Sequence, residues 1–156
     1  MPTVSPHLCL SNASAAIEFY RKALGAEEVM RMPAQDGKRL MHAAVKIGDS
    51  TIMMADEFPE MCRPDSPRSP AALGGTTVTI HINVPDVDAT MASAAAAGGT
   101  IMMPATDMFW GERYGQFRDP FGHVWSVSTT LKRLTPQEMK EAGDAFFKQA
   151  QRQQQQ

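Results

Sequence analysis

The hydrophobic pattern of this chain occurs twice, at an offset of 74 residues. Each copy begins with a stretch in which apolar and polar residues alternate, at 3–10 and at 78–84. Such alternation predicts a strand with one buried face. Apolar residues at helical spacing follow in each copy, after Asn12 and after Asp86, which are typical N-cap residues. The pattern therefore predicts two copies of one supersecondary unit.

Both copies are expected to have the order β-α-β-β-β. In copy one, the helix covers 13–24 and the later strands 28–32, 40–47 and 51–55. In copy two, the helix ends near residue 97, and strands follow near 100–103, 114–118 and 123–129. Turn glycines coincide at the same offset, because Gly25 matches Gly99 and Gly48 matches Gly122.

The same pattern divides the chain into two modules and a tail. Module one covers 3–56 and module two 76–130, and the segment 57–75 between them holds four prolines and a Gly-Gly pair, so it is a linker. A capping box at 135–138 predicts a C-terminal helix over 135–150. We expect an α+β fold in which two βαβββ modules form a curved eight-stranded sheet around a cavity, plus this helix.

The alternation also predicts which side chains face the cavity. Leu8 and Leu10 belong to the apolar face that packs on the helix, so Ser5, His7 and Cys9 face away from it. The matching residues in copy two are Thr79, His81 and Asn83. With the ungapped offset carried into the fourth strands, the cavity-facing residues are Ser50, Ile52, Met54, Asp56, Val124, Ser126 and Ser128. A partly apolar concavity with a few polar groups is typical of a small-molecule site.

Composition narrows the function further. A net charge of -2 and a pI near 6.1 do not favour nucleic acid or an anionic membrane as a partner. The chain has no apolar run that approaches a membrane span, and its first residues do not read as a signal peptide. Two cysteines are too few for a disulfide framework. We therefore expect a cytoplasmic protein.

Several motifs resemble the vicinal oxygen chelate superfamily, which includes glyoxalase I, bleomycin-resistance proteins, fosfomycin-resistance enzymes and extradiol dioxygenases. They are the helix end Phe19-Tyr20-Arg21-Lys22-Ala23-Leu24-Gly25 and the turn Asp119-Pro120-Phe121-Gly122-His123. The segments 47–50, 52–57 and 107–111 resemble its PhnB-like branch. The resemblance covers about residues 3–130.

The resemblance implies positions for a divalent metal, one near the start of each first strand and one on each fourth strand. In this sequence they fall on Ser5, Ile52, Thr79 and Ser126. None is a histidine or a glutamate, and hydroxyls and isoleucine are poor ligands for such an ion. We therefore expect no metal and no other cofactor at these positions.

Two histidines and two aromatic residues are the remaining candidates. His7 and His81 are equivalent in the repeat, and three readings stay open for them: a general base or ligand contact, a displaced divalent metal site, or purely structural hydrogen bonding. Phe109 and Trp110 lie in a glycine-flanked loop, where they form either a cavity wall or a plug in the core or in a dimer interface.

These observations predict a small-molecule binding protein that resembles the bleomycin-resistance type. Its expected ligand contacts are Ser5, Thr79, Ser126, Ile52, Met54, Phe109 and Trp110, with His7 and His81 as catalytic candidates. The alternative is a lyase-, isomerase- or dioxygenase-type enzyme that uses a displaced divalent metal or an imidazole base. The resemblance also implies a homodimer, in which the C-terminal helix could pack at the interface.

Overall fold

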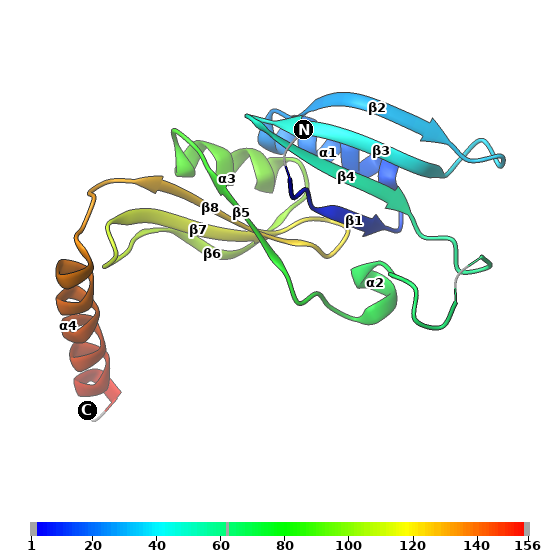
Figure 1. Ribbon diagram of the computed structural model, residues 1–156. Helices are drawn as coiled ribbons and strands as arrows, with labels where there is room; N and C mark the ends of the chain where they lie inside the picture. The colour runs from blue at the N-terminus through cyan, green and yellow to red at the C-terminus, as the bar shows by residue number, and fades with distance from the viewer. Residues whose placement is uncertain (1–2, 62, 155–156) are drawn as a thin grey trace.

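Both modules have the predicted β-α-β-β-β order (Figure 1). The computed structural model describes residues 3–61 and 63–154. Module one consists of β1 (His7–Leu10), α1 (Ala13–Leu24), β2 (Glu27–Pro33), β3 (Leu40–Ile47) and β4 (Ser50–Asp56). A short helix, α2 (Pro70–Leu73), lies in the linker. Module two consists of β5 (Thr79–Asn83), α3 (Val87–Ala96), β6 (Thr100–Asp107), β7 (Glu112–Arg118) and β8 (Val124–Thr130), and α4 (Pro136–Gln154) follows.

The strands form two separate four-stranded sheets instead of one continuous eight-stranded sheet. The first sheet has the order β1-β4-β3-β2 and the second the order β5-β8-β7-β6. In each sheet the first strand pairs in parallel with the fourth, and the other pairs are antiparallel. The α+β class is thus confirmed, while β1 and β5 each stand at the edge of their own sheet.

The helices α1 and α3 lie together in a layer between the two sheets. They contact each other, and α1 packs on the first sheet while α3 packs on the second. Side chains of α1 also reach the second sheet, since the Phe19 and Phe117 rings are 6.2 Å apart and the Tyr20 and Trp125 rings 5.2 Å apart. One hydrophobic core therefore serves both modules, and the helix-free faces of the two sheets look away from each other.

Asp119 ties the modules together inside this core. Its Oδ2 atom accepts hydrogen bonds from the Tyr20 hydroxyl at 2.7 Å and from Trp125 Nε1 at 3.0 Å. Its Oδ1 atom accepts the backbone N–H groups of Phe121 and His123, which shapes the turn before β8. Burial, and secondarily the charge of Asp119, raises the pKa of Tyr20 well above its usual value.

The predicted orientation of β4 is wrong. Ile52 and Met54 are in the core, with 4% and 0% of their surface exposed, and not on the helix-free face. The register explains the error: Ile47 pairs with Ser50 across a two-residue turn, whereas Arg118 pairs with Val124 across five residues. The ungapped repeat therefore fails at this hairpin, and a slip of one residue reverses the two faces of a strand.

Asp56 has the same orientation and a structural role. Its carboxylate is buried, and it accepts the backbone N–H of Ala13, at the start of α1, and that of Leu40, at the start of β3, both at 2.7 Å. These charge-assisted hydrogen bonds join helix and strand within module one. Asp56 is therefore not at a cavity rim, where the sequence pattern placed it.

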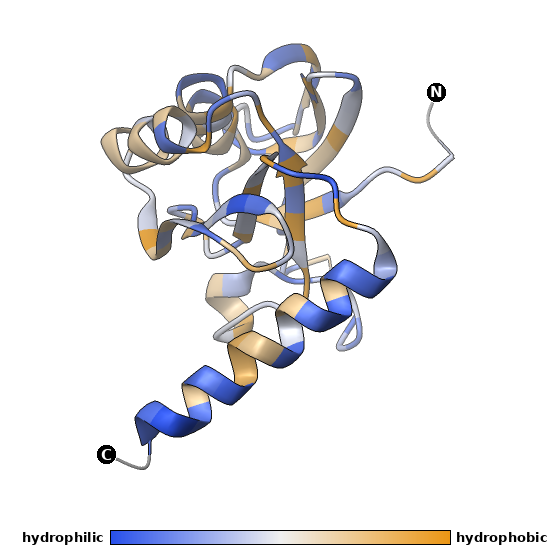
Figure 2. Ribbon diagram, turned by 90° about the vertical axis from the view of Figure 1, so that its left-hand side faces the viewer, coloured by the Kyte–Doolittle hydropathy of each residue, from blue (hydrophilic) through white to orange (hydrophobic). Residues whose placement is uncertain are grey.

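The C-terminal helix α4 extends away from the body of the molecule (Figures 1 and 2). Its contact with the body centres on Phe109, whose ring lies 5.1 Å from that of Phe146 and 6.2 Å from that of Phe147. Gly143 is the buried residue of the helix, and it faces the same ring. Within the described part of the chain, no helix combines the length and the apolar character that a bilayer crossing requires.

Candidate functional site

A connected set of polar side chains lies on the helix-free face of the second sheet. In register, His81 lies beside Ser126 and Gln116, and the next row holds Asn83, Ser128 and Tyr114. We call these six residues the His81 face. For His81 and Ser126 the predicted orientation is confirmed, because Ile80, Ile82, Trp125 and Val127 occupy the opposite, core-facing side.

Hydrogen bonds hold both ring nitrogens of His81. Ser128 Oγ donates its proton to Asn83 Oδ1 at 3.0 Å and lies 3.1 Å from His81 Nε2. A hydroxyl has one proton, so Ser128 accepts from Nε2. His81 Nδ1 lies 2.8 Å from Ser126 Oγ. The imidazole is thus fixed between two serines that are 3% and 0% exposed.

Aromatic side chains border this network. The Tyr114 ring stacks near His81, with a centroid distance of 6.3 Å and an angle of 15° between the planes. The Trp110 ring meets Tyr114 edge-on at 5.6 Å, and its Nε1 atom donates to Glu112 at 2.8 Å. Trp110 thus belongs to a wall beside the His81 face. Phe109 contacts the Trp110 ring but packs mainly on α4, which corresponds to the alternative reading of a plug.

His7 lies on the other sheet and has different neighbours. Its ring contacts that of His42, with 5.6 Å between the centroids and 78° between the planes. Burial, and to a smaller extent the charge of His42, lowers the pKa of His7 below its ordinary value. His7 belongs to the first sheet and His81 to the second, and their ring partners differ, His42 for one and Tyr114 for the other. Among the described residues neither histidine is in a group of three or more His, Cys, Asp or Glu side chains placed to hold a metal ion.

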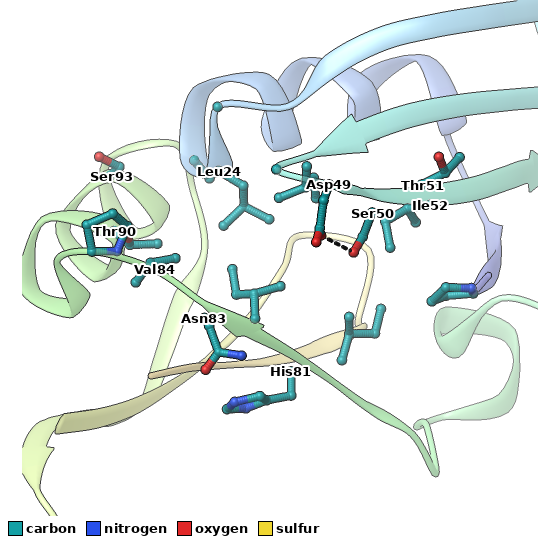
Figure 3. A pocket seen from close by; sticks show the side chains of 18 of the residues that line it. Leu24, Asp49, Ser50, Thr51, Ile52, His81, Asn83, Val84, Thr90 and Ser93 are labelled. Atoms are coloured by element: carbon teal, nitrogen blue, oxygen red, sulfur yellow. Dashed lines mark hydrogen bonds between the residues drawn. The ribbon is translucent and has the colours of Figure 1, made fainter. Parts of the chain in front are cut away.

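A cleft of about 860 Å³ runs along the free edge of β5, and His81 and Asn83 are among its lining residues (Figure 3). Module one contributes the end of α1 and the β3–β4 hairpin, including Leu24, Asp49 and Ser50, and module two contributes β5 and the start of α3. His81 and Asn83 lie on the opposite side of β5 from Asp49. The cleft and the His81 face therefore meet only at this strand.

The predicted metal positions do not form a metal site. Ile52 is in the core, and the Ser126 hydroxyl is occupied by His81. Ser5 precedes β1 and Thr79 begins β5, so these hydroxyls belong to different sheets. Across residues 3–61 and 63–154, no group of three or more His, Cys, Asp or Glu side chains is placed to hold a metal ion. The residues present do not fit the divalent ion that the resemblance implies.

Two members of the His81 face, Tyr114 and Gln116, were not predicted as site residues. Gln116 Nε2 donates to the Tyr114 hydroxyl at 2.8 Å, a bond within β7, and the Tyr114 ring contacts that of His81. The same alternation that placed His81 would have found both residues, if it had been applied to the strand at 114–118.

Three comparisons connect this fold with known proteins. The family model of the glyoxalase/bleomycin resistance protein/dioxygenase superfamily matches residues 4–127. The uncharacterized protein Mb0911c of Mycobacterium bovis is 45% identical over 141 residues, which cover 90% of this chain and 91% of that protein. The crystal structure of TioX from Micromonospora sp. ML1 has a TM-score of 0.66 and 24% identity, covering 84% of this chain and all of TioX. A PhnB protein from Bacillus cereus has a TM-score of 0.61 and 15% identity, covering 83% of this chain and all of that one.

Proposed function

Because the chain belongs to the glyoxalase/bleomycin resistance protein/dioxygenase superfamily, we propose that it binds a small organic molecule on the His81 face without a metal ion. The observation that carries this proposal is the His81 ring, held by hydrogen bonds between Ser126 and Ser128. Preorganised polar groups beside an aromatic wall are characteristic of small-molecule sites. They orient a ligand without a further ordering cost.

The chemistry of the face indicates a neutral ligand with a flat, partly apolar surface. The six residues of this face supply hydroxyl, amide and imidazole groups, which donate and accept hydrogen bonds, and include no carboxylate, lysine or arginine. Tyr114 and Trp110 supply aromatic surface on which a ring system stacks. The nearby carboxylate of Glu112 is engaged by Trp110. A neutral heteroaromatic compound fits this combination.

The proposed site is completed by a second copy of the chain, which makes the protein a homodimer. His81 and Asn83 are exposed on this face, and β1 and β5 are at sheet edges. Unprotected edges favour association with another strand. The helix-free face of the first sheet also exposes Met30 and Met32, by 44% and 46%. A partner that places this face over His81 would bury both surfaces and enclose a cavity.

Membership of the PhnB-like branch and a cytoplasmic location are also part of this proposal. Membership of the PhnB-like branch is supported by the segments at 47–50, 52–57 and 107–111 and by the shared fold with the Bacillus cereus protein. A cytoplasmic location is supported by the low number of cysteines.

One observation favours an enzyme as the second candidate. His81 Nδ1 lies within hydrogen-bond distance of the Ser126 hydroxyl, an arrangement in which an imidazole can act as a general base. Turnover of a bound compound that is lost in His81→Ala would support this reading over simple binding.

The proposal is tested by screening fluorinated, neutral bicyclic heteroaromatic compounds by ¹⁹F NMR and measuring affinities from the quenching of Trp110 fluorescence. We expect His81→Ala and Ser126→Ala to weaken binding at least tenfold. Ser50→Ala, which alters the module-one side of the cleft, is the matched control and should leave affinity unchanged. If affinity follows Ser50 and not His81, the cleft is the binding site and the proposal is refuted.

The proposed dimer is tested by sedimentation velocity over a range of protein concentrations, which should show a dimer at micromolar protein. A monomer throughout this range would remove the second copy from the proposed site.

A further inference from the structure

The helix-free face of the first sheet carries soft metal ligands close together. His7 pairs in register with Met53 on β4, and His42 on β3 pairs with Met32 on β2. The His7–His42 ring contact of 5.6 Å shows that the two imidazoles approach each other across the intervening strand. Residues that are register partners share one face of a sheet. Two imidazoles and two thioethers are thus neighbours on this face.

Small residues leave space for the two rings to meet. Two alanines lie near the rings on this face. Ala44 on β3 pairs with Met53, and Ala55 is the next residue of β4 on the same face. Neither methyl group rises far above the sheet. His7 and His42 therefore lean toward each other over a shallow floor, with the Met53 side chain beside His7.

The donor set selects the type of ion. Thioethers are soft ligands that prefer Cu(I), whereas divalent ions such as zinc take imidazole, thiolate and carboxylate. Where the structure describes the chain, no carboxylate joins His7 and His42 in a metal-binding group. A neutral N,N,S set suits a soft monovalent ion better than a hard divalent one.

We propose that His7, His42 and Met53 form a binding site for Cu(I), with Met32 as a flanking thioether. The site is confined to the first sheet. His7 comes from β1, His42 from β3 and Met53 from β4. Each protomer carries the three ligands itself, so the site forms in one chain, although in the proposed dimer this face lies over His81 of the partner subunit.

The test is an anaerobic titration of Cu(I), supplied as its bicinchoninate complex, in a background where Cys9 and Cys62 are both replaced by alanine. This background removes the thiols, which would otherwise compete for Cu(I). We expect one Cu(I) per chain. His7→Asn and His42→Asn should each weaken binding at least tenfold, and Met53→Leu should weaken it several-fold. Met139→Leu, which replaces an exposed methionine of α4, should leave the affinity unchanged.

X-ray absorption on the copper-loaded chain provides the second readout, with the original cysteines retained. Both nitrogen and sulfur scatterers are expected around the copper. Sulfur-only coordination would overturn the proposal, as would a titration in which His7→Asn and His42→Asn bind as well as the parent. Failure of the cysteine-free background to take up any Cu(I) while it retains its native circular dichroism would also overturn it.

Discussion

The buried hydrogen bond between Tyr20 and Asp119 gives a stability prediction that can be worked out from the structure. Tyr20→Phe removes only the hydroxyl, and the ring keeps its packing against Trp125 and Phe19. A hydrogen bond to a charged group contributes roughly 1.5–3 kcal/mol. Asp119 retains three other donors, so we expect the loss to be about 2 kcal/mol.

Urea denaturation measures this loss, followed by circular dichroism and by Trp125 fluorescence. With a slope of about 2 kcal/mol per molar urea, the midpoint should fall by about 1 M. Tyr114→Phe is the matched control, since Tyr114 is the other tyrosine of the chain and lies on the half-buried His81 face. It should lower stability by less than about 1 kcal/mol.

A double-mutant cycle identifies the interaction. In an Asp119→Ala background the Tyr20 hydroxyl has lost its acceptor, so Tyr20→Phe should cost nothing there or even stabilise the fold. The reasoning is refuted if Tyr20→Phe costs the same in both backgrounds, or if it shifts the midpoint no further than Tyr114→Phe does.

The raised pKa of Tyr20 adds a pH dependence. Tyr20 stays neutral in the folded state while the unfolded chain ionises near pH 10, so the unfolded state releases its proton first. The stabilisation is therefore complete below pH 10 and decreases as the pH rises towards the folded-state pKa. Between pH 9 and pH 11 the stability difference from Tyr20→Phe should shrink by about 1.4 kcal/mol.

Three further predictions concern other regions. Gly111→Ala should lower the free energy of unfolding by at least about 3 kcal/mol in a urea titration, because φ is +90° and a Cβ would overlap the Lys132 carbonyl. Gly37→Ala is the control: φ is +67° but the space around it is open, so the loss should be about 1 kcal/mol. Phe109→Ala should release α4, seen as faster proteolysis after residue 135 with an unchanged melting temperature for the body. In an NMR titration the midpoint of His7 should lie below pH 6.5. His42→Ala should raise this midpoint only part of the way to 6.5, because burial lowers the pKa of His7 more than the charge of His42 does. A midpoint that His42→Ala leaves unchanged would contradict the ring contact.

Local signals in the sequence predicted the elements well. Asn12 and Asp86 accept hydrogen bonds from Ala15 N–H and Ala89 N–H, as N-caps do. Gly25 ends α1 in the left-handed conformation, with φ of 63°. These features depend on a few neighbouring residues, so the sequence contains the information directly. The bounds differ where packing extends an element, as in β6, which continues through residue 107.

The errors come from relations between elements that local pattern does not encode. The repeat aligns Gly48 with Gly122, yet the loops at these glycines differ in length, and this alone reversed the predicted faces of β4. The contact of His7 with His42 depends on the strand order β1-β4-β3, which the alternation within each strand does not specify. The packing of α1 against Trp125 likewise depends on contacts between the two modules, which local sequence does not specify.

That shared core also bears on how such a chain can be divided or can have arisen. Neither module covers its own interior: α1 of module one shields Trp125 and Phe117 of module two, and the hydroxyl of Tyr20 has its acceptor in the other half. A nick in the exposed stretch near residues 63–68 would therefore leave two fragments that remain associated. By the same logic, a primitive protein with a single βαβββ unit needed a second unit against its helix from the start, and gene fusion then made that association permanent.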